Sequence, residues 1–310
     1  MIESELNNFY LSSKRSFIFT DIDLDGAMSY TLFRWMTNNK SIPYITTRIV
    51  DFKKTFENWL KKHKLSDYDA VYILDLDVSS ECPELVDHPN VVIIDHHESH
   101  VRNKDKYTKC KTFIETYPSC SKYIYKLFGS TLSDKLSVDQ KRLILMVDDY
   151  DSYNLSIEGS DELNLLFWNY QGDKLMKFIN EFGEGFSEFT TDQTKIISFY
   201  KKKRNNVISD LEIYDGNIPI GGTDTRVVAT FASSCINEVA DHIIKKYTAD
   251  IGIVVNTQSG KISFRKSTKC KVDLSKLAKT LAKGGGHEYS AGGIMCDEFN
   301  SFSKLLNRID

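Results

Sequence analysis

The length and composition of the chain indicate a folded protein of two domains. Its 310 residues are 41% hydrophobic and 12% aromatic, which is enough for two cores and excludes a disordered polypeptide. No apolar run reaches the roughly 18 residues of a membrane span, and the net charge of −3 excludes a protein that holds long nucleic acids by charge alone.

The first 150 residues alternate short strands with amphipathic helices. Apolar and β-branched runs predict strands at residues 16–20, 70–76 and 91–94. Helices are expected at residues 27–37, 52–64 and 120–128. This rhythm predicts an α/β fold with a mostly parallel sheet covered by helices.

Acidic residues follow each of the three predicted strands. They are Asp21, Asp23 and Asp25, then Asp75 and Asp77, then Asp95. Ligands bind outside the carboxyl ends of strands in open α/β sheets, so these carboxylates are expected to converge in space.

The rest of the chain predicts a helical segment and a second, smaller α/β domain. Residues 160–210 lack strand signals, and glycines and a proline at 216–222 mark a boundary. Beyond it we expect helices at 232–247 and 273–282 and strands at 250–256 and 261–265. The predicted organisation is a catalytic domain over 1–190, a helical linker over 191–211 and a substrate-binding domain over 212–310.

The first acidic motif, residues 21–26, places three carboxylates at alternate positions just beyond a strand. Alternate side chains of an extended chain share a face, so all three can point at one divalent cation. The spacing also begins an EF-hand loop, but the Glu required at position 12 is absent, because that position is Leu32. A solvated acidic turn is the alternative.

Two further motifs carry metal-ligand chemistry. In Asp95-His96-His97 the adjacent histidines face different ways, so one can bind a metal while the other has a separate role. Residues 148–151 (Asp-Asp-Tyr-Asp) follow a predicted helix, whose C-terminal dipole disfavours acids unless a cation offsets the repulsion. Solvated acids are the alternative for the second motif.

The C-terminal part predicts an anion-binding surface. Residues 261–283 hold eight basic side chains against one acid, Asp273. The following Gly284-Gly285-Gly286-His287 offers backbone N–H groups to a phosphate. An anionic substrate held between this domain and the acid-rich N-terminal half explains both features, with a solvated helix face and a plain loop as the alternatives.

Together these motifs resemble the DHH phosphoesterase superfamily, in the branch with a DHH-associated C-terminal domain. The N-terminal matches are residues 21–29, 71–75, 95–97 and 147–151. The C-terminal matches are residues 263–265, 272–279 and 284–287. The motifs follow the order of the family and span residues 17–293.

The resemblance implies a centre of two divalent cations, usually Mn²⁺ with Mg²⁺ as the alternative, that activates a water for attack on phosphorus. The implied metal ligands are Asp23, Asp25, Asp75, His96 and Asp149. The implied catalytic residues are His97, which contacts the scissile phosphate in the family, and Asp95. The implied substrate-binding residues are Arg265, Ser267, Gly285, Gly286 and His287.

Two positions depart from the family pattern. Many members carry a histidine ligand where this chain has Phe19, so either the first metal is bound more weakly or Asp21 compensates. The Arg-Ser step of the family reads Arg265-Lys266-Ser267 here, which leaves the alignment of Ser267 open by one residue.

The resemblance leaves the substrate open. Hydrolysis of short single-stranded oligonucleotides or nucleotide phosphates, as in nanoRNase members, is favoured because nothing after Gly293 resembles the oligonucleotide-binding barrel of long exonucleases. A RecJ-like single-stranded DNA exonuclease is the alternative, since its first motif is the closer match. A cyclic-dinucleotide phosphodiesterase and a non-catalytic nucleotide-binding module are less favoured, the latter because the core acids and both histidines are retained.

The N-terminus and the cysteines predict a cytoplasmic protein. Residues 1–5 are acidic and lack the layout of a secretory signal. The six cysteines form no CxxC pair, so reduced thiols are expected rather than disulfides or a zinc site. No membrane partner is expected, and the oligomeric state, monomer or homodimer, stays open.

Overall fold

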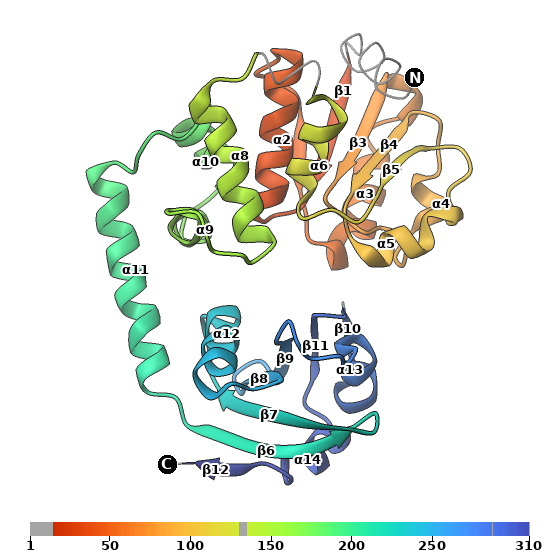
Figure 1. Cartoon of the computed structure of the whole chain (residues 1–310). Coiled ribbons are helices and arrows are strands. Elements are labelled where there is room, and N and C mark those ends of the chain that lie inside the picture. Colours follow the sequence, from red (N-terminus) through yellow and green to blue (C-terminus); the bar gives the residue numbers. More distant parts are fainter. Residues whose placement is uncertain (1–14, 130–134, 287, 310) are drawn as a thin grey trace. The chain divides into compact units, whose positions relative to one another are not determined.

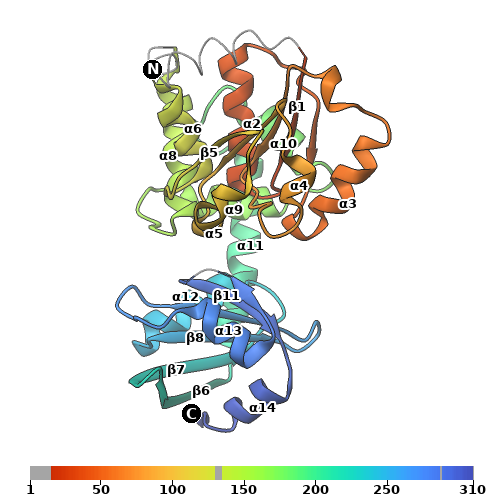
Figure 2. The same cartoon turned by 90° about the vertical axis from the view of Figure 1, so that its right-hand side faces the viewer.

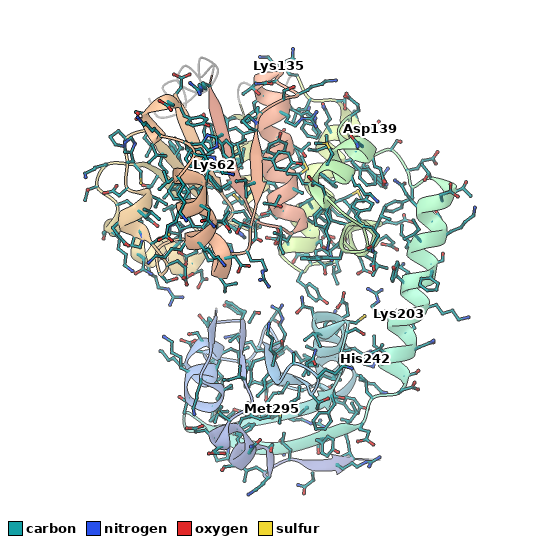
Figure 3. All side chains as sticks on the ribbon, turned by 180° about the vertical axis from the view of Figure 1, so that it is seen from behind. Lys62, Lys135, Asp139, Lys203, His242 and Met295 are labelled. Atoms are coloured by element: carbon teal, nitrogen blue, oxygen red, sulfur yellow. The ribbon has the colours of Figure 1, made fainter. Side chains whose placement is uncertain are left out.

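The computed structural model describes residues 15–129, 135–286 and 288–309. The chain divides into two compact units, Met1–Ile197 and Ser198–Asp310. The division falls within α11 (Thr191–Ser209), the helix that carries Lys203 in Figure 3. None of the helices in the described ranges combines the length and apolar character that a bilayer crossing requires, and the six cysteines are free.

The N-terminal unit is built on a five-stranded parallel sheet (Figure 1), which confirms the predicted fold. In spatial order its strands are β2 (Tyr44–Thr46), β1 (Ser16–Thr20), β3 (Ala70–Leu74), β4 (Val91–Asp95) and β5 (Lys111–Ile114). β3 and β4 are buried along their whole length, which explains why they read as unbroken apolar runs. The two short edge strands, β2 and β5, were not predicted from the sequence.

Helices cover both faces of this sheet. On one face α3 (Ile49–Leu60) and α4 (Pro83–Val86) enclose an aromatic core. On the other face lie α2 (Leu24–Thr37) and α6 (Cys120–Leu127), against which α8 (Val138–Asp151) packs. The remaining helices are α5 (Glu98–Asn103), α9 (Ser160–Trp168) and α10 (Lys174–Phe182), with 3-10 turns η1 (Leu65–Asp67) and η2 (Lys104–Lys106).

Helix α2 begins directly after the first acidic motif. Asp23 is its N-cap, and the Asp23 Oδ1 atom accepts a hydrogen bond of 2.9 Å from the Gly26 N–H. A Cβ atom added at Gly26 would lie 2.5 Å from the Asp21 carbonyl oxygen, so only glycine allows this close approach. The cap and the contact fix the acidic loop at the end of β1.

The C-terminal unit contains a seven-stranded mixed sheet with helices on both faces (Figure 2). In spatial order the strands are β10 (Gly285–Gly286), β11 (Ser290–Ile294), β9 (Lys261–Lys266), β8 (Ile251–Asn256), β7 (Thr223–Phe231), β6 (Ile213–Ile220) and β12 (Asn307–Ile309). α12 (Ile236–Tyr247) packs on one face, and α13 (Leu274–Ala282) and α14 (Asp297–Ser303) pack on the other. The smaller α/β domain is confirmed.

The hairpin of β6 and β7 was not predicted. Gly216 and Pro219 read as boundary signals, yet both lie inside β6 and pair with Val227 and Asp224 of β7. Pro219 is tolerated because it lies near the turn, where a missing N–H donor costs little.

Candidate metal centre

The structure gathers carboxylates and histidines beyond the carboxyl ends of β1, β3 and β4, where the last residue of α8, Asp151, joins them. One ligand atom of each of Asp25, His96 and Asp151 lies within 4.8 Å of the others, and the same holds for Asp75, His96 and His97. The His96 Nε2 atom is 3.3 Å from Asp75 Oδ1 and 3.7 Å from Asp151 Oδ2. These five residues are called the metal-site cluster below, and they meet where the predicted fold places ligand sites.

The orientation of the His96 ring is fixed by a hydrogen bond on the side away from the cluster. Its Nδ1 atom lies 2.9 Å from the carbonyl oxygen of Tyr117, which can only accept a hydrogen bond. The Nδ1–H group therefore donates to Tyr117, and Nε2 faces Asp75 and Asp151, where its lone pair is available to a cation held by their carboxylates. This is the arrangement usual for metal-binding histidines.

Asp25 and Asp75 are held by the backbone around them. Asp25 is 2% exposed, and its carboxylate accepts hydrogen bonds from the Cys120 N–H (2.6 Å) and the Ser121 N–H (3.0 Å), at the start of α6. Asp75 is also 2% exposed and adopts φ 59, a left-handed conformation that costs energy outside glycine. The strained backbone directs Asp75 into the cluster at the end of β3.

Like charges accumulate in this cluster. Burial raises the pKa of Asp75 well above its usual value, and the charges of Asp25 and Asp23 raise it further. Burial and the same two neighbours also raise the pKa of Asp151. Burial likewise raises the pKa of Asp25, against the opposing effect of His96.

A divalent cation would remove this repulsion. The donor set is carboxylate oxygen and imidazole nitrogen, without thiolate, which fits Mn²⁺ and Mg²⁺. Asp23 belongs with these donors electrostatically, since its charge raises the pKa of both Asp75 and Asp151. The residues present therefore fit the metal that the sequence motifs imply.

His97 belongs to a chain of hydrogen bonds that runs into the protein. Its Nδ1 atom is 2.8 Å from Asp95 Oδ1, and Asp95 Oδ2 is 2.7 Å from His100 Nδ1. His100 Nε2 is 2.8 Å from the hydroxyl of Tyr107, and both Asp95 and His100 are fully buried. Burial lowers the pKa of His97, but the charge and hydrogen bond of Asp95 outweigh it and raise the pKa to about 10.

This chain makes His97 a proton donor held in one orientation. With Nδ1 bound to Asp95, Nε2 is the nitrogen through which His97 can act on a substrate. Asp95 orients His97 and does not itself line the site. His100 was not predicted, although its position three residues after His97, on the short helix α5 of which His97 is the N-cap, is the signal that could have identified it.

Asp149 does not join the metal-site cluster. Its carboxylate accepts hydrogen bonds from the Ser156 and Ser160 hydroxyls and from the backbone N–H groups of Ser156 and Ile157. These four donors overcome burial and lower the pKa of Asp149. The carboxylate fastens the end of α8 to the start of α9, and Asp151 occupies the place in the cluster that the motif assigned to Asp149.

Asp148, the first acid of the same motif, also has hydrogen-bond donors from neighbouring side chains. Asp148 accepts hydrogen bonds from the Ser119 hydroxyl at 2.8 Å and from the Lys122 ammonium. Of the three acids at the end of α8, only Asp151 therefore faces the cluster. The repulsion expected at this helix end is relieved at two residues by protein donors and remains at the third.

The histidine position of the family is filled here by a core aromatic residue. Phe19 is fully buried, with its ring centroid 5.2 Å from Phe56 and 5.8 Å from Phe52. It offers no ligand atom to the cluster. Asp21 lies close to the cluster: burial and then the charge of Asp23 raise its pKa to about 7.

The substrate-binding residues implied for the C-terminal unit lie on one edge of its sheet. Arg265 pairs with Ser290 in the β9–β11 ladder, and Gly285 and Gly286 form β10 beside β11. Arg265 donates from Nη2 to Asn237 Oδ1 at 2.9 Å. Ser267 lies beyond the end of β9, where its N–H donates to the Asp250 carbonyl, and His287 lies outside the described residues.

A lysine with a buried side chain stands between Arg265 and Ser267. The Lys266 side chain is 1% exposed, and its ammonium lies 2.9 Å from the Val272 carbonyl and 2.8 Å from Glu288 Oε1. It also lies 4.3 Å from the centroid of the Tyr289 ring. Lys266 therefore ties β9 to the chain that follows the glycine run.

These features define a two-domain α/β protein with a carboxylate and histidine cluster at the carboxyl edge of a parallel sheet. The sequence pattern of the DHHA1 domain matches residues 225–309. No curated protein sequence matches the chain.

Solved structures share the fold over nearly the whole chain. A pGpG-specific phosphodiesterase, PggH, from Vibrio cholerae is 16% identical, with a TM-score of 0.59 over 94% of this chain and 96% of that one. An exopolyphosphatase-related protein from Bacteroides fragilis is 14% identical, with a TM-score of 0.60 over 98% and 95%. Exonuclease RecJ bound to manganese is 12% identical, with a TM-score of 0.53 over 98% and 92%.

Residues 225–309 of the C-terminal unit thus match the DHHA1 domain, and the whole chain shares its two-domain fold with these solved structures. The resemblance drawn from the motifs is thereby confirmed.

Proposed function

We propose that the chain is a metal-dependent phosphodiesterase that hydrolyses short oligonucleotides or nucleotide phosphates. The proposed metal is Mn²⁺, with Mg²⁺ as the alternative. The observation that carries the proposal is the metal-site cluster: the buried carboxylates of Asp25 and Asp75 and the partly buried carboxylate of Asp151 lie around the oriented Nε2 atom of His96. Buried like charges without a cation are costly, and a functional site is the usual reason for keeping them.

In this proposal Asp23, Asp25, Asp75, His96 and Asp151 hold two cations. The cations would supply Lewis-acid activation of water and neutralise charge on the phosphate. Burial raises the pKa of Asp75, and the charges of Asp25, Asp23 and Asp151 raise it further, so Asp75 is the acid on which the other carboxylates of the site act together. His97, oriented by Asp95, donates a proton or a hydrogen bond from Nε2 to the phosphate or the leaving oxygen.

The C-terminal unit is proposed to bind the rest of the substrate. The Arg265 guanidinium can grip a phosphate with two parallel hydrogen bonds. The backbone of Gly285 and Gly286, and His287, are the partners proposed beside it. A substrate held in this way is short, and the fold shared with a pGpG-specific phosphodiesterase supports that substrate class.

The alternative is a single-stranded DNA exonuclease, which the fold shared with manganese-bound RecJ supports. The two proposals differ in the dependence on strand length. Labelled RNA and DNA of two to twenty nucleotides, assayed with Mn²⁺, should show the highest turnover per molecule at two to five nucleotides and little dependence on salt. A rate that rises steadily with length and collapses with modest salt would favour the exonuclease.

The metal dependence has its own test. Chelation and dialysis should abolish turnover, and added Mn²⁺ should restore it. Asp75→Ala should lose activity by several orders of magnitude, because Asp75 is proposed to contact both ions. Asp105→Ala, a change at an exposed surface acid, is the matched control and should retain activity. Full turnover after chelation would rule out a metal-dependent reaction.

A further inference from the structure

A second feature of the N-terminal unit adjoins the metal-site cluster. A cavity of about 420 Å³ lies between the acidic loop after β1 and the start of α10. Asp21 and Asp23 line it from the acidic loop, and Asp173 and Lys174, called its far wall below, line it from the start of α10. Its volume is within the range of roughly 300–1,000 Å³ typical of small-molecule sites.

The far wall of the cavity is held in place by contacts that are distant in sequence. The Tyr44 hydroxyl donates to Asp173 Oδ2 at 2.7 Å, across 129 residues of chain. The other Asp173 oxygen accepts from the Met176 N–H and caps α10. The wall is therefore built onto the sheet, which favours a site that is formed before a ligand binds.

Lys174 is the only cation among the described residues that line this cavity. Its ammonium lies 4.3 Å from the centroid of the Trp168 ring and 3.1 Å from the Trp168 carbonyl oxygen. Apolar residues also line the cavity, among them Phe167 and Leu175, which are called its floor below. The cavity thus combines an apolar floor, a surplus of carboxylates and one ammonium group that is already engaged.

This chemistry selects among the parts of an oligonucleotide. A phosphate would meet three carboxylates and a single lysine, so it is disfavoured. A nucleobase is uncharged, presents a flat apolar face to the floor and carries donors on its edge. Exocyclic amino groups of adenine, guanine and cytosine can donate to a carboxylate, whereas thymine and uracil lack such a group.

We propose that this cavity is a nucleoside subsite, which takes the base and sugar next to the phosphate held at the metal-site cluster. The inference rests on the proposed phosphodiesterase function and names its specificity: a base with an amino group on this side of the scissile bond. Asp21 and Asp23 form the wall shared by the cavity and the acidic edge of the cluster.

The first experiment measures binding without hydrolysis. Adenosine, which has no phosphate, is titrated into the full-length protein while the fluorescence of Trp168 is followed, with Trp168→Phe identifying the signal. Thr46, at the end of β2, lines the cavity, and Thr46→Phe fills it. Saturable binding to the wild type that weakens at least about tenfold in Thr46→Phe supports the subsite, and equal binding by both proteins overturns it.

A second pair of variants keeps the proposal testable if Thr46→Phe, which fills the cavity, fails to fold. Lys174→Met changes the cavity wall, and Lys177→Met removes an exposed lysine of the same helix that does not line the cavity. Lys174→Met should weaken adenosine binding about threefold to tenfold, and Lys177→Met should leave it unchanged. Equal effects of the two changes would overturn the proposal.

The final experiment separates this inference from the proposed function. With Mn²⁺, wild type is expected to show a KM at least tenfold lower for a diadenosine dinucleotide than for the same dinucleotide with one abasic residue, at similar kcat. Thr46→Phe should abolish that difference. Turnover with equal KM for the diadenosine and the abasic dinucleotide refutes the subsite and leaves the proposed phosphodiesterase function standing. Adenosine binding without any turnover refutes the phosphodiesterase and leaves the nucleoside subsite.

Discussion

The two units treat buried charge in opposite ways. In the C-terminal unit the buried Lys266 ammonium has a carboxylate, a carbonyl and an aromatic ring around it. In the N-terminal unit Asp25, Asp75 and Asp151 are brought together; burial raises the pKa of Asp75 and Asp151, and the charge of Asp25 raises both further. A satisfied buried charge stabilises the native structure, whereas a group of unsatisfied like charges indicates a ligand that neutralises them.

The same contrast exists inside one helix end. Asp149 receives four hydrogen bonds and acts as a structural brace, whereas Asp151, two residues later, faces Asp25 and His96. Two acids of one motif therefore have opposite roles. Substituting each in turn is the most direct way to break the comparison.

The largest effect is expected for Asp151→Asn. Loss of this carboxylate should lower Mn²⁺-dependent turnover by about two to three orders of magnitude, as when a charge contact to the reacting centre is removed. It should also weaken Mn²⁺ binding measured by calorimetry, while the melting temperature of the metal-free protein holds or rises because repulsion is relieved.

Asp149→Asn is the matched control and should do the reverse. An amide leaves some of the four donors without an acceptor, at a cost of about 1–3 kcal/mol, so the melting temperature should fall by several degrees. Mn²⁺ affinity in the folded protein should be retained. Loss of metal binding in Asp149→Asn, with Asp151→Asn unaffected, would restore the assignment made from the sequence motif.

This pair also shows what sequence alone could establish. The strands that precede Asp21 and Asp75 and the strand that ends in Asp95 follow from unbroken apolar runs, and their convergence follows from parallel topology. The choice between Asp149 and Asp151 depends on which side of α8 faces the cluster at its last turn, because residues two apart on a helix point to different sides. That side is set by contacts with Ser156 and Ser160, whose arrangement is not encoded in the motif.

The C-terminal prediction was limited for a related reason. Strands β8 and β9 are apolar and were identified, but β6 carries Gly216 and Pro219 and was read as a boundary. Its pairing with β7 outweighs local preference, as is common for strands. The cavity beside Asp21 could not be predicted either, because it depends on Asp173 meeting Tyr44 across the fold.

Arg265→Ala sharpens the comparison from the C-terminal side. If this unit binds the anionic substrate, the substitution should lower kcat/KM about tenfold to a thousandfold, mainly through KM, and leave Mn²⁺ binding unchanged. Lys279→Ala, an exposed change on α13, is the control and should have little effect. Equally small effects of both substitutions on oligonucleotide turnover would show that the unit does not hold the substrate.

A smaller effect is expected at His100, which contacts Asp95 and not the substrate. His100→Leu removes the donor to Asp95 Oδ2 and should lower kcat about tenfold, the low end for a positioning effect, with KM unchanged. His100→Asn retains an N–H donor near the position of Nδ1 and should recover much of the rate. A merely structural role predicts no such difference between Leu and Asn in two folded variants.

The smallest effect, a dependence of stability on pH, follows from the carboxylates with raised pKa. Burial and the charge of Asp23 raise the pKa of Asp21 to about 7, and burial and like charges raise the pKa of Asp75 and Asp151. Between about pH 4 and 7 the folded metal-free protein therefore binds more protons than the unfolded chain, and unfolding releases them.

Raising the pH through this window should therefore destabilise the metal-free protein. Differential scanning calorimetry should show the melting temperature of the N-terminal unit falling, on the order of 5 °C, from pH 5 to pH 8. The lowered pKa of Asp149 acts below this window, since its contribution is lost only on further acidification. With saturating Mn²⁺ the trend should reverse, because metal binding requires ionised carboxylates and strengthens as they lose protons. The same slope with and without Mn²⁺ would mean that the cluster does not bind the metal.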